Sequence, residues 1–172
     1  MKKSAKRKPK GGGPALVQSA ETVAFDDYLE SLRSVLAGTN YETHFEAKSF
    51  KLAGDYLPIK EIMLLVYPAS KPDEARITQW PVETMIEAIN PCISVPWYAG
   101  EAHADADGVA VASRQVDFWC HLQNCIDYDR ADIYRYGSGV GLPGYAVFWQ
   151  FAWLIHSPAQ KRCVFLYGVS SD

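Results

Sequence analysis

The C-terminal third of the chain carries the pattern that most restricts the fold. From Tyr145 to Ile155 every second residue is aromatic or β-branched, and the residues between them are more varied. Alternation with a period of two is typical of a β-strand that buries one face. The segment Ser157-Pro158-Ala159-Gln160 has turn-forming composition, and a second apolar run follows from Arg162 to Val169. The pattern therefore predicts an antiparallel β-hairpin.

Two segments have helical periodicity. Apolar residues recur every three or four positions from Val23 to Ala37, after Thr22 as a candidate N-cap. The second segment, from Val82 to Ile89, follows Pro81, which suits the first turn of a helix. Because proline disrupts a helix interior, we expect this shorter helix to end before Pro91.

The remaining apolar runs are interpreted as strands, and together they define the expected fold class. The predicted strands are His44–Leu52, Ile62–Tyr67, Cys92–Tyr98, Val109–Cys120 and Ile133–Tyr136. The expected fold is α+β, with an N-terminal amphipathic helix packed on a mostly antiparallel sheet, a second short helix and the C-terminal hairpin. We expect one domain over residues 19–172, preceded by a disordered basic tail over residues 1–18.

Charge is distributed very unevenly along the chain. Six of the 17 basic residues fall within the first ten positions, where there is no acidic residue. The rest of the chain has 11 basic and 20 acidic residues, which gives it a formal charge of −9. The tail could bind phosphates, and the body could bind cations. The candidate nucleic-acid-binding residues are Lys2, Lys3, Lys6, Arg7, Lys8 and Lys10.

The sequence favours an intracellular, soluble protein. The N-terminal segment lacks the apolar core of an export signal, and the apolar run from Tyr145 to Ile155 is too short to cross a membrane. We therefore expect a cytoplasmic location, reduced cysteines and no membrane partner.

No motif in the sequence predicts a cofactor, a metal site or a catalytic residue. Gly139, Gly141 and Gly144 fit the G-x-G-x-x-G spacing, but an expected strand follows them where dinucleotide binding needs a helix. Their simplest interpretation is a loop that needs positive φ or close backbone contact. Cys120, His121 and Cys125 lack the second ligand pair typical of a zinc site.

The remaining candidate residues are aromatic rings and histidines near the apolar runs. Tyrosine and tryptophan often anchor interfaces, because they combine a large rigid body with a polar tip. The candidate ligand or interface residues are Trp97, Tyr98, Trp119, His121, Trp149, Trp153 and His156.

Three hypotheses for function follow. The first is a non-enzymatic binding protein, similar in role to an inhibitor or immunity protein, whose acidic aromatic-rich body recognises a protein partner. The second is a structural protein of a nucleic-acid-containing assembly, held by the basic arm. The third is a small-molecule-binding protein or enzyme with an aromatic pocket around Trp149 and Trp153. A pocket that joins His121 or His156 to a carboxylate would favour the third.

Overall fold

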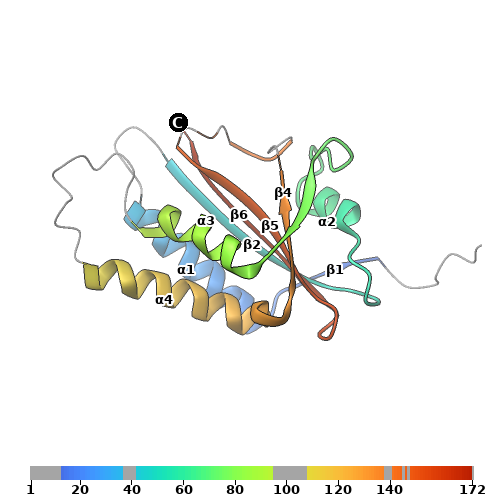
Figure 1. Ribbon diagram of the computed structural model, residues 1–172, viewed down its shortest axis with the longest axis horizontal. Coiled ribbons are helices and arrows are strands. Elements are labelled where there is room, and N and C mark those ends of the chain that lie inside the picture. Colours follow the sequence, from blue (N-terminus) through green and yellow to red (C-terminus); the bar gives the residue numbers. More distant parts are fainter. Residues whose placement is uncertain are drawn as a thin grey trace, which may run out of the picture.

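The computed structural model describes residues 13–36, 42–94, 108–137, 141–144, 146 and 148–171. They form an α+β domain in which helices pack on a six-stranded antiparallel sheet (Figure 1). The strands are β1 (Ala15–Val17), β2 (Glu42–Lys51), β3 (Ile77–Trp80), β4 (Asp132–Tyr136), β5 (Gln150–Ser157) and β6 (Arg162–Ser171). The helices are α1 (Ala20–Leu36), α2 (Ile59–Val66), α3 (Val82–Ser94) and α4 (Gly108–Cys125), with a 3₁₀ turn, η2, at Tyr128–Arg130.

The predicted C-terminal hairpin is confirmed and lies at the centre of the sheet. The strand order is β1-β2-β6-β5-β4-β3, so β5 and β6 each have a hydrogen-bonded neighbouring strand at both edges. The hairpin turn is closed by a hydrogen bond from the Lys161 amide to the Pro158 carbonyl. Lys161 takes a positive φ of 49°, which lets the chain reverse within this short connection. Because β5 is shorter than expected and begins at Gln150, Trp149 precedes the strand.

One face of the sheet packs against α1, α3 and α4, which Figure 1 shows grouped on one side of the sheet. The predicted first helix is confirmed as α1, which buries a stripe of Phe25, Leu29, Leu32 and Leu36. The odd-numbered residues of β5 meet these helices, as the alternating pattern predicts.

The opposite face packs against α2 and the loops around it, and α2 stands apart from the other helices in Figure 1. Its centre is apolar, with Leu154, Phe165 and the α2 residues Ile62 and Met63 all buried. Polar side chains lie toward the two ends of this face. None of the helices in the described ranges is both long and apolar enough to cross a membrane.

Two segments predicted as strands are helices. Ile62–Tyr67 lies mainly in α2, where Ile62 and Met63 are buried while Leu64 and Leu65 are largely exposed. Val109–Cys120 lies in α4, whose buried residues Phe118, Leu122 and Cys125 have helical spacing. A short apolar run and several β-branched valines suit either structure, and the packing against the sheet decides between them.

The other differences concern where elements begin and end. The α3 helix continues through Pro91 to Ser94, so the expected stop and the predicted strand from Cys92 are wrong over these residues. Burial of Ile89 and Ile93 on either side of the proline stabilises the extra turn against its lost hydrogen bond. At α1, the Thr22 amide donates to Ser19 Oγ, so Ser19, not Thr22, caps the helix.

Part of the predicted tail is a strand. Ala15–Val17 form β1, which pairs antiparallel with the Ser49–Lys51 end of β2. The apolar Ala-Leu-Val triplet suits this pairing better than the basic residues before it.

The glycine-rich loop after β4 makes close backbone contacts, as the sequence predicts. Gly141 has φ of +74°, and a Cβ atom there would lie 2.2 Å from the Ala69 carbonyl oxygen. At Gly137 a Cβ atom would lie 2.6 Å from the Arg76 carbonyl oxygen. Only glycine allows the loop to approach the segment between α2 and β3 this closely.

Candidate functional site

A pocket of about 490 Å³ lies on the α2 face, at the β3 side of the sheet. One wall is formed by β3, β4 and β5, and the other by the loop before α2, the start of α2 and the segment after it. This volume falls within the range of roughly 300–1,000 Å³ that is usual for ligand pockets. Its polar and aromatic lining residues are Asp55, Tyr56, Lys60, Asp73, Asp132, Tyr134 and His156.

The sheet register places His156 beside a carboxylate. Asp132, the first residue of β4, pairs with His156 near the end of β5, so both side chains point to the α2 face. The Asp132 Oδ2 atom lies 3.8 Å from His156 Nδ1. From the edge strand, Gln79 Nε2 donates a hydrogen bond of 3.3 Å to Asp132 Oδ1. Three adjacent strands thus contribute one polar row.

His156 is buried without hydrogen bonds. The residue is 3% exposed, and neither Nδ1 nor Nε2 has a hydrogen-bond partner in the described part of the chain. Burial lowers the pKa of His156 below its ordinary value of 6.5, and the carboxylates of Asp132 and Asp55 oppose this effect only in part. A neutral imidazole offers one donor and one acceptor, and here both are unsatisfied beside a pocket.

The charges that line the pocket are mostly negative. Lys60 and three aspartates contribute side chains, and Lys60 Nζ lies 2.5 Å from Asp73 Oδ2. This ion pair leaves Asp55 and Asp132 to set the charge of the pocket. The arrangement therefore favours a positively charged ligand.

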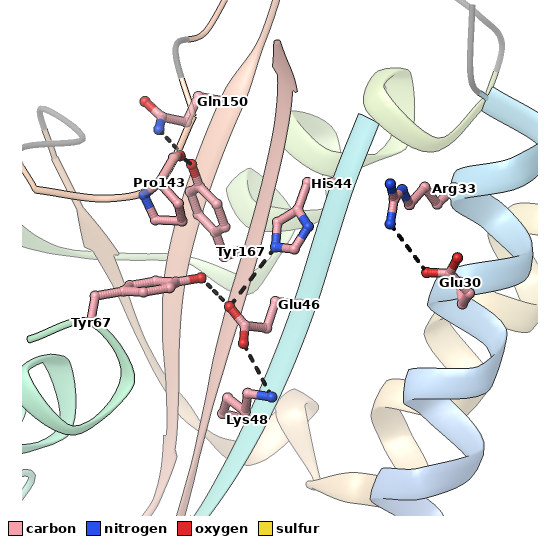
Figure 2. Close-up of polar contacts among 9 residues, drawn as sticks. All are labelled: Glu30, Arg33, His44, Glu46, Lys48, Tyr67, Pro143, Gln150 and Tyr167. Atoms are coloured by element: carbon pink, nitrogen blue, oxygen red, sulfur yellow. Dashed lines mark hydrogen bonds and ion pairs between the residues drawn. The ribbon is translucent and has the colours of Figure 1, made fainter. Parts of the chain in front are cut away.

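A second polar cluster occupies the other end of the same sheet face (Figure 2). His44, Lys48 and Tyr67 converge on the carboxylate of Glu46. The Tyr67 hydroxyl, just after α2, donates a short hydrogen bond to Glu46 Oε2, and Lys48 Nζ lies 3.1 Å from Oε1. Burial alone would raise the pKa of Glu46, but hydrogen bonds with His44, Tyr67 and Lys48 lower it to about 2.

The neighbouring tyrosine links this end of the face to the glycine loop. Tyr167 accepts a hydrogen bond from Gln150 Nε2 at 2.9 Å and donates one to the Pro143 carbonyl (Figure 2). Glu46 thus holds the end of α2 while Tyr167 holds the glycine loop against the sheet. Because the Glu46 carboxylate and the Tyr167 hydroxyl both have partners within the protein, we interpret this cluster as a structural clamp.

The two tryptophans expected to line a pocket belong to the core instead. Trp153 is 1% exposed and lies in the helix-side core. Trp149 is half-buried against the same core and stacks on Phe45 and Phe151. The aromatic pocket of the third hypothesis is therefore not formed by this pair.

Two other candidates lie on α4, away from the pocket with His156. His121 stacks on Tyr28 with ring centroids 4.8 Å apart. Trp119 lines a separate pocket of about 480 Å³ between α3 and α4, where its Nε1 donates to Asn90 Oδ1 at 2.8 Å. Of the predicted residues that the structure describes, only His156 lines the acidic pocket.

The remaining candidates lie outside the described residues. These are Trp97, Tyr98, Lys2, Lys3, Lys6, Arg7, Lys8 and Lys10.

Sequence reasoning missed the acidic residues of the pocket. Asp55 lies in an irregular loop, and nothing in its local sequence connects it to His156. Asp132 directly precedes the predicted Ile133–Tyr136 strand, but its pairing with His156 depends on the register between β4 and β5, which the turn of the hairpin does not set. Within the described ranges, no group of three or more His, Cys, Asp or Glu side chains is placed to hold a metal ion.

Comparisons with known proteins connect this chain to one fold. No family model and no curated protein matches the sequence. Two crystal structures of MAF1 from citrus are similar, each with a TM-score of 0.56. One is 9% identical and is matched over 90% of this chain and 98% of the citrus chain; the other is 11% identical, with 88% and 98% matched. At these identities, the similarity means that this chain shares its fold with citrus MAF1.

Proposed function

We propose that this protein is a binding protein that recognises a basic protein partner through the acidic pocket. The observation that carries the proposal is the composition of that pocket, where Asp55 and Asp132 remain after Lys60 pairs with Asp73. The body as a whole has a formal charge of −9 beyond the first ten residues. A field of this sign accelerates encounter with a cationic partner and disfavours acidic ones.

The openness of the pocket favours a protein over a small molecule. The side chains of Asp73 and Lys60 are 76% and 59% exposed, and Tyr56 at the rim is 81% exposed. A small ligand usually has most of its surface enclosed by the pocket. A side chain of a protein partner needs less enclosure, because the rest of the partner covers it from outside. The exposed ring of Tyr56 provides contact area at the pocket.

A small cationic ligand is the second candidate, and a specific observation favours it. His156 lies beside Asp132 in a pocket, which is the arrangement that would support the third hypothesis. A basic protein and a small cation would both use these pocket residues, so the two functions are distinguished by the size of the ligand that binds.

The test is a pull-down at moderate salt that compares the wild type with the Asp55→Asn/Asp132→Asn double variant. We expect the wild type to retain a basic protein, identified by mass spectrometry and verified by calorimetry with the purified partner. Asp27→Asn, on the exposed surface of α1, is the single-charge control and should retain the partner. Recovery of nucleic acid alone, or equal recovery by the double variant, would contradict the proposal.

A further inference from the structure

The pocket wall contains hydrogen-bonding capacity that the described part of the protein does not use. Among the described residues, neither nitrogen of buried His156 has a hydrogen-bond partner, although the ring lines an open pocket. Burying a polar group without a partner is unfavourable because the group loses its hydrogen bonds to water, so such groups usually have a partner in the functional state. The nearest charged atom, Asp132 Oδ2, lies at 3.8 Å from Nδ1, which is too far for a hydrogen bond.

The acceptor atoms of this pocket wall favour a ligand that donates several hydrogen bonds. Gln79 already occupies Asp132 Oδ1, and Oδ2 faces the imidazole. A neutral imidazole presents a lone pair on one nitrogen, so the wall holds two kinds of acceptor, this lone pair and the Asp132 carboxylate. A ligand with two donors in fixed positions could reach both acceptors at once.

A guanidinium group fits these requirements better than an ammonium group. It is planar, carries five N–H donors in a fixed arrangement and stacks on aromatic rings. The pocket provides the rings of Tyr56 and Tyr134 for stacking and the carboxylates of Asp55 and Asp132 for charge. An ammonium group is a strongly hydrated point charge, and its desolvation beside buried His156 is less well compensated.

We infer that the pocket with His156 and Asp132 binds a guanidinium group, such as the side chain of an arginine on the partner. This inference rests on the proposed function, because it assigns the group that enters the same pocket. The imidazole accepts one hydrogen bond from the guanidinium, and Asp132 accepts another while neutralising its charge.

The test uses isotope-labelled protein and three capped amino acids as probes. The probes are the Nα-acetylated amides of arginine, lysine and citrulline, whose side chains are unmodified. Each is titrated separately while the imidazole signals of His156 are followed by NMR. We expect saturable shifts with the arginine probe, affinity for the lysine probe about tenfold weaker, and no shift with citrulline, which lacks the charge. Equal affinity for arginine and lysine would overturn the inference.

Two variants check that the signal comes from this pocket. Asp132→Asn should weaken arginine binding by about tenfold or more, whereas Asp27→Asn on α1 should leave it unchanged. If both variants bind the arginine probe equally well, the pocket is not the binding site.

The failure of this inference can be separated from the failure of the proposed function. A peptide with one central arginine is compared with its lysine counterpart and with the free capped amino acids. A pocket-dependent protein partner that prefers the lysine peptide would overturn the inference and leave the proposed function standing. Tight binding of the free arginine probe, with no gain from the peptide and no protein partner, would support the inference and contradict the proposed function.

Discussion

At the level of single residues, we expect His156 to destabilise the folded protein in the absence of a ligand. Its two nitrogens are buried and have no hydrogen-bond partner among the described residues, so replacing the ring with an apolar side chain should remove a desolvation cost. We expect His156→Leu to raise the free energy of unfolding by about 1 kcal/mol while weakening binding of the arginine probe by about tenfold. Thermal unfolding and NMR titration measure the two effects.

His156→Asn serves as the comparison, because it leaves a polar group in the same buried position. It should weaken arginine binding without any gain in stability. If His156→Leu instead lowers the free energy of unfolding by more than about 1 kcal/mol, the imidazole has hydrogen-bond partners in the folded protein, and its proposed role is incorrect.

Glu46 links stability to pH through its lowered pKa. Its pKa falls from 4.5 to about 2 on folding, so its contribution to stability is complete above pH 4.5 and is lost as the pH falls towards 2. We expect Glu46→Gln to lower the free energy of unfolding at pH 7 by roughly 1–3 kcal/mol, and this difference from the wild type should shrink across that window. Chemical denaturation between pH 2 and pH 7 measures it.

The matched control for Glu46→Gln lies on the same strand. The Glu42 side chain is 76% exposed, and its ion pair with Arg33 is 3.9 Å long, so Glu42→Gln should change stability little at any pH. A Glu46→Gln deficit that does not depend on pH would contradict the role given to the carboxylate.

The site was only partly predictable at this scale. His156 could be named from the sequence because it continues the alternating face of the hairpin. Its acidic neighbours could not all be named, because Asp55 reaches the pocket through an irregular loop whose path depends on tertiary packing. Conversely, the prominent Trp153 is buried in the core, since a large aromatic residue suits either a core or a binding surface.

At the level of elements, the packing between β5 and β6 depends on one glycine. A Cβ atom at Gly168 would lie 2.4 Å from the ring of Phe151, its neighbour across the strands, and that ring is 4% exposed. We expect Gly168→Ala to lower the free energy of unfolding by roughly 1–3 kcal/mol, because a confined ring must move. Chemical denaturation provides the measurement.

Gly54→Ala is the control for that substitution. A Cβ atom at Gly54 meets nothing within 4 Å, so the change should stay within about 0.5 kcal/mol. Equal effects at the two glycines would mean that the hairpin can repack around an added methyl group.

Elements were predictable where the sequence pattern has a single interpretation. The hairpin and α1 have clear periods of two and 3.6 residues, respectively, and both were predicted. The α4 helix was not, because its exposed positions Val109 and Val116 are β-branched and favour a strand when considered locally. Only the burial of Phe118 and Leu122 beneath this surface identifies the helix.

At the level of the whole molecule, the basic N-terminal residues and the acidic body should act independently. Deleting Met1 to Gly13 removes six basic residues but none of the residues that line the pocket. We expect the deletion to abolish any salt-sensitive binding to nonspecific DNA or RNA and to leave binding of the arginine probe unchanged. Fluorescence anisotropy with a nonspecific duplex at several salt concentrations, beside the NMR titration, measures both.

The second hypothesis depends on the first of these results. Nucleic-acid binding that survives the deletion would contradict a role for the basic arm. Loss of arginine binding on deletion would instead show that the two charged regions are coupled.

The short pairing between β1 and β2 has a consequence for the behaviour of the protein at high concentration. β1 covers only Ser49–Lys51, and in the described part of the chain no strand pairs with the rest of that edge. An open strand edge invites pairing with another molecule and is a common start of aggregation. Here the open stretch carries Glu42, His44, Glu46 and Lys48 on alternate positions. These charges disfavour such pairing, so the cluster that clamps α2 also helps to keep neighbouring copies of the sheet apart.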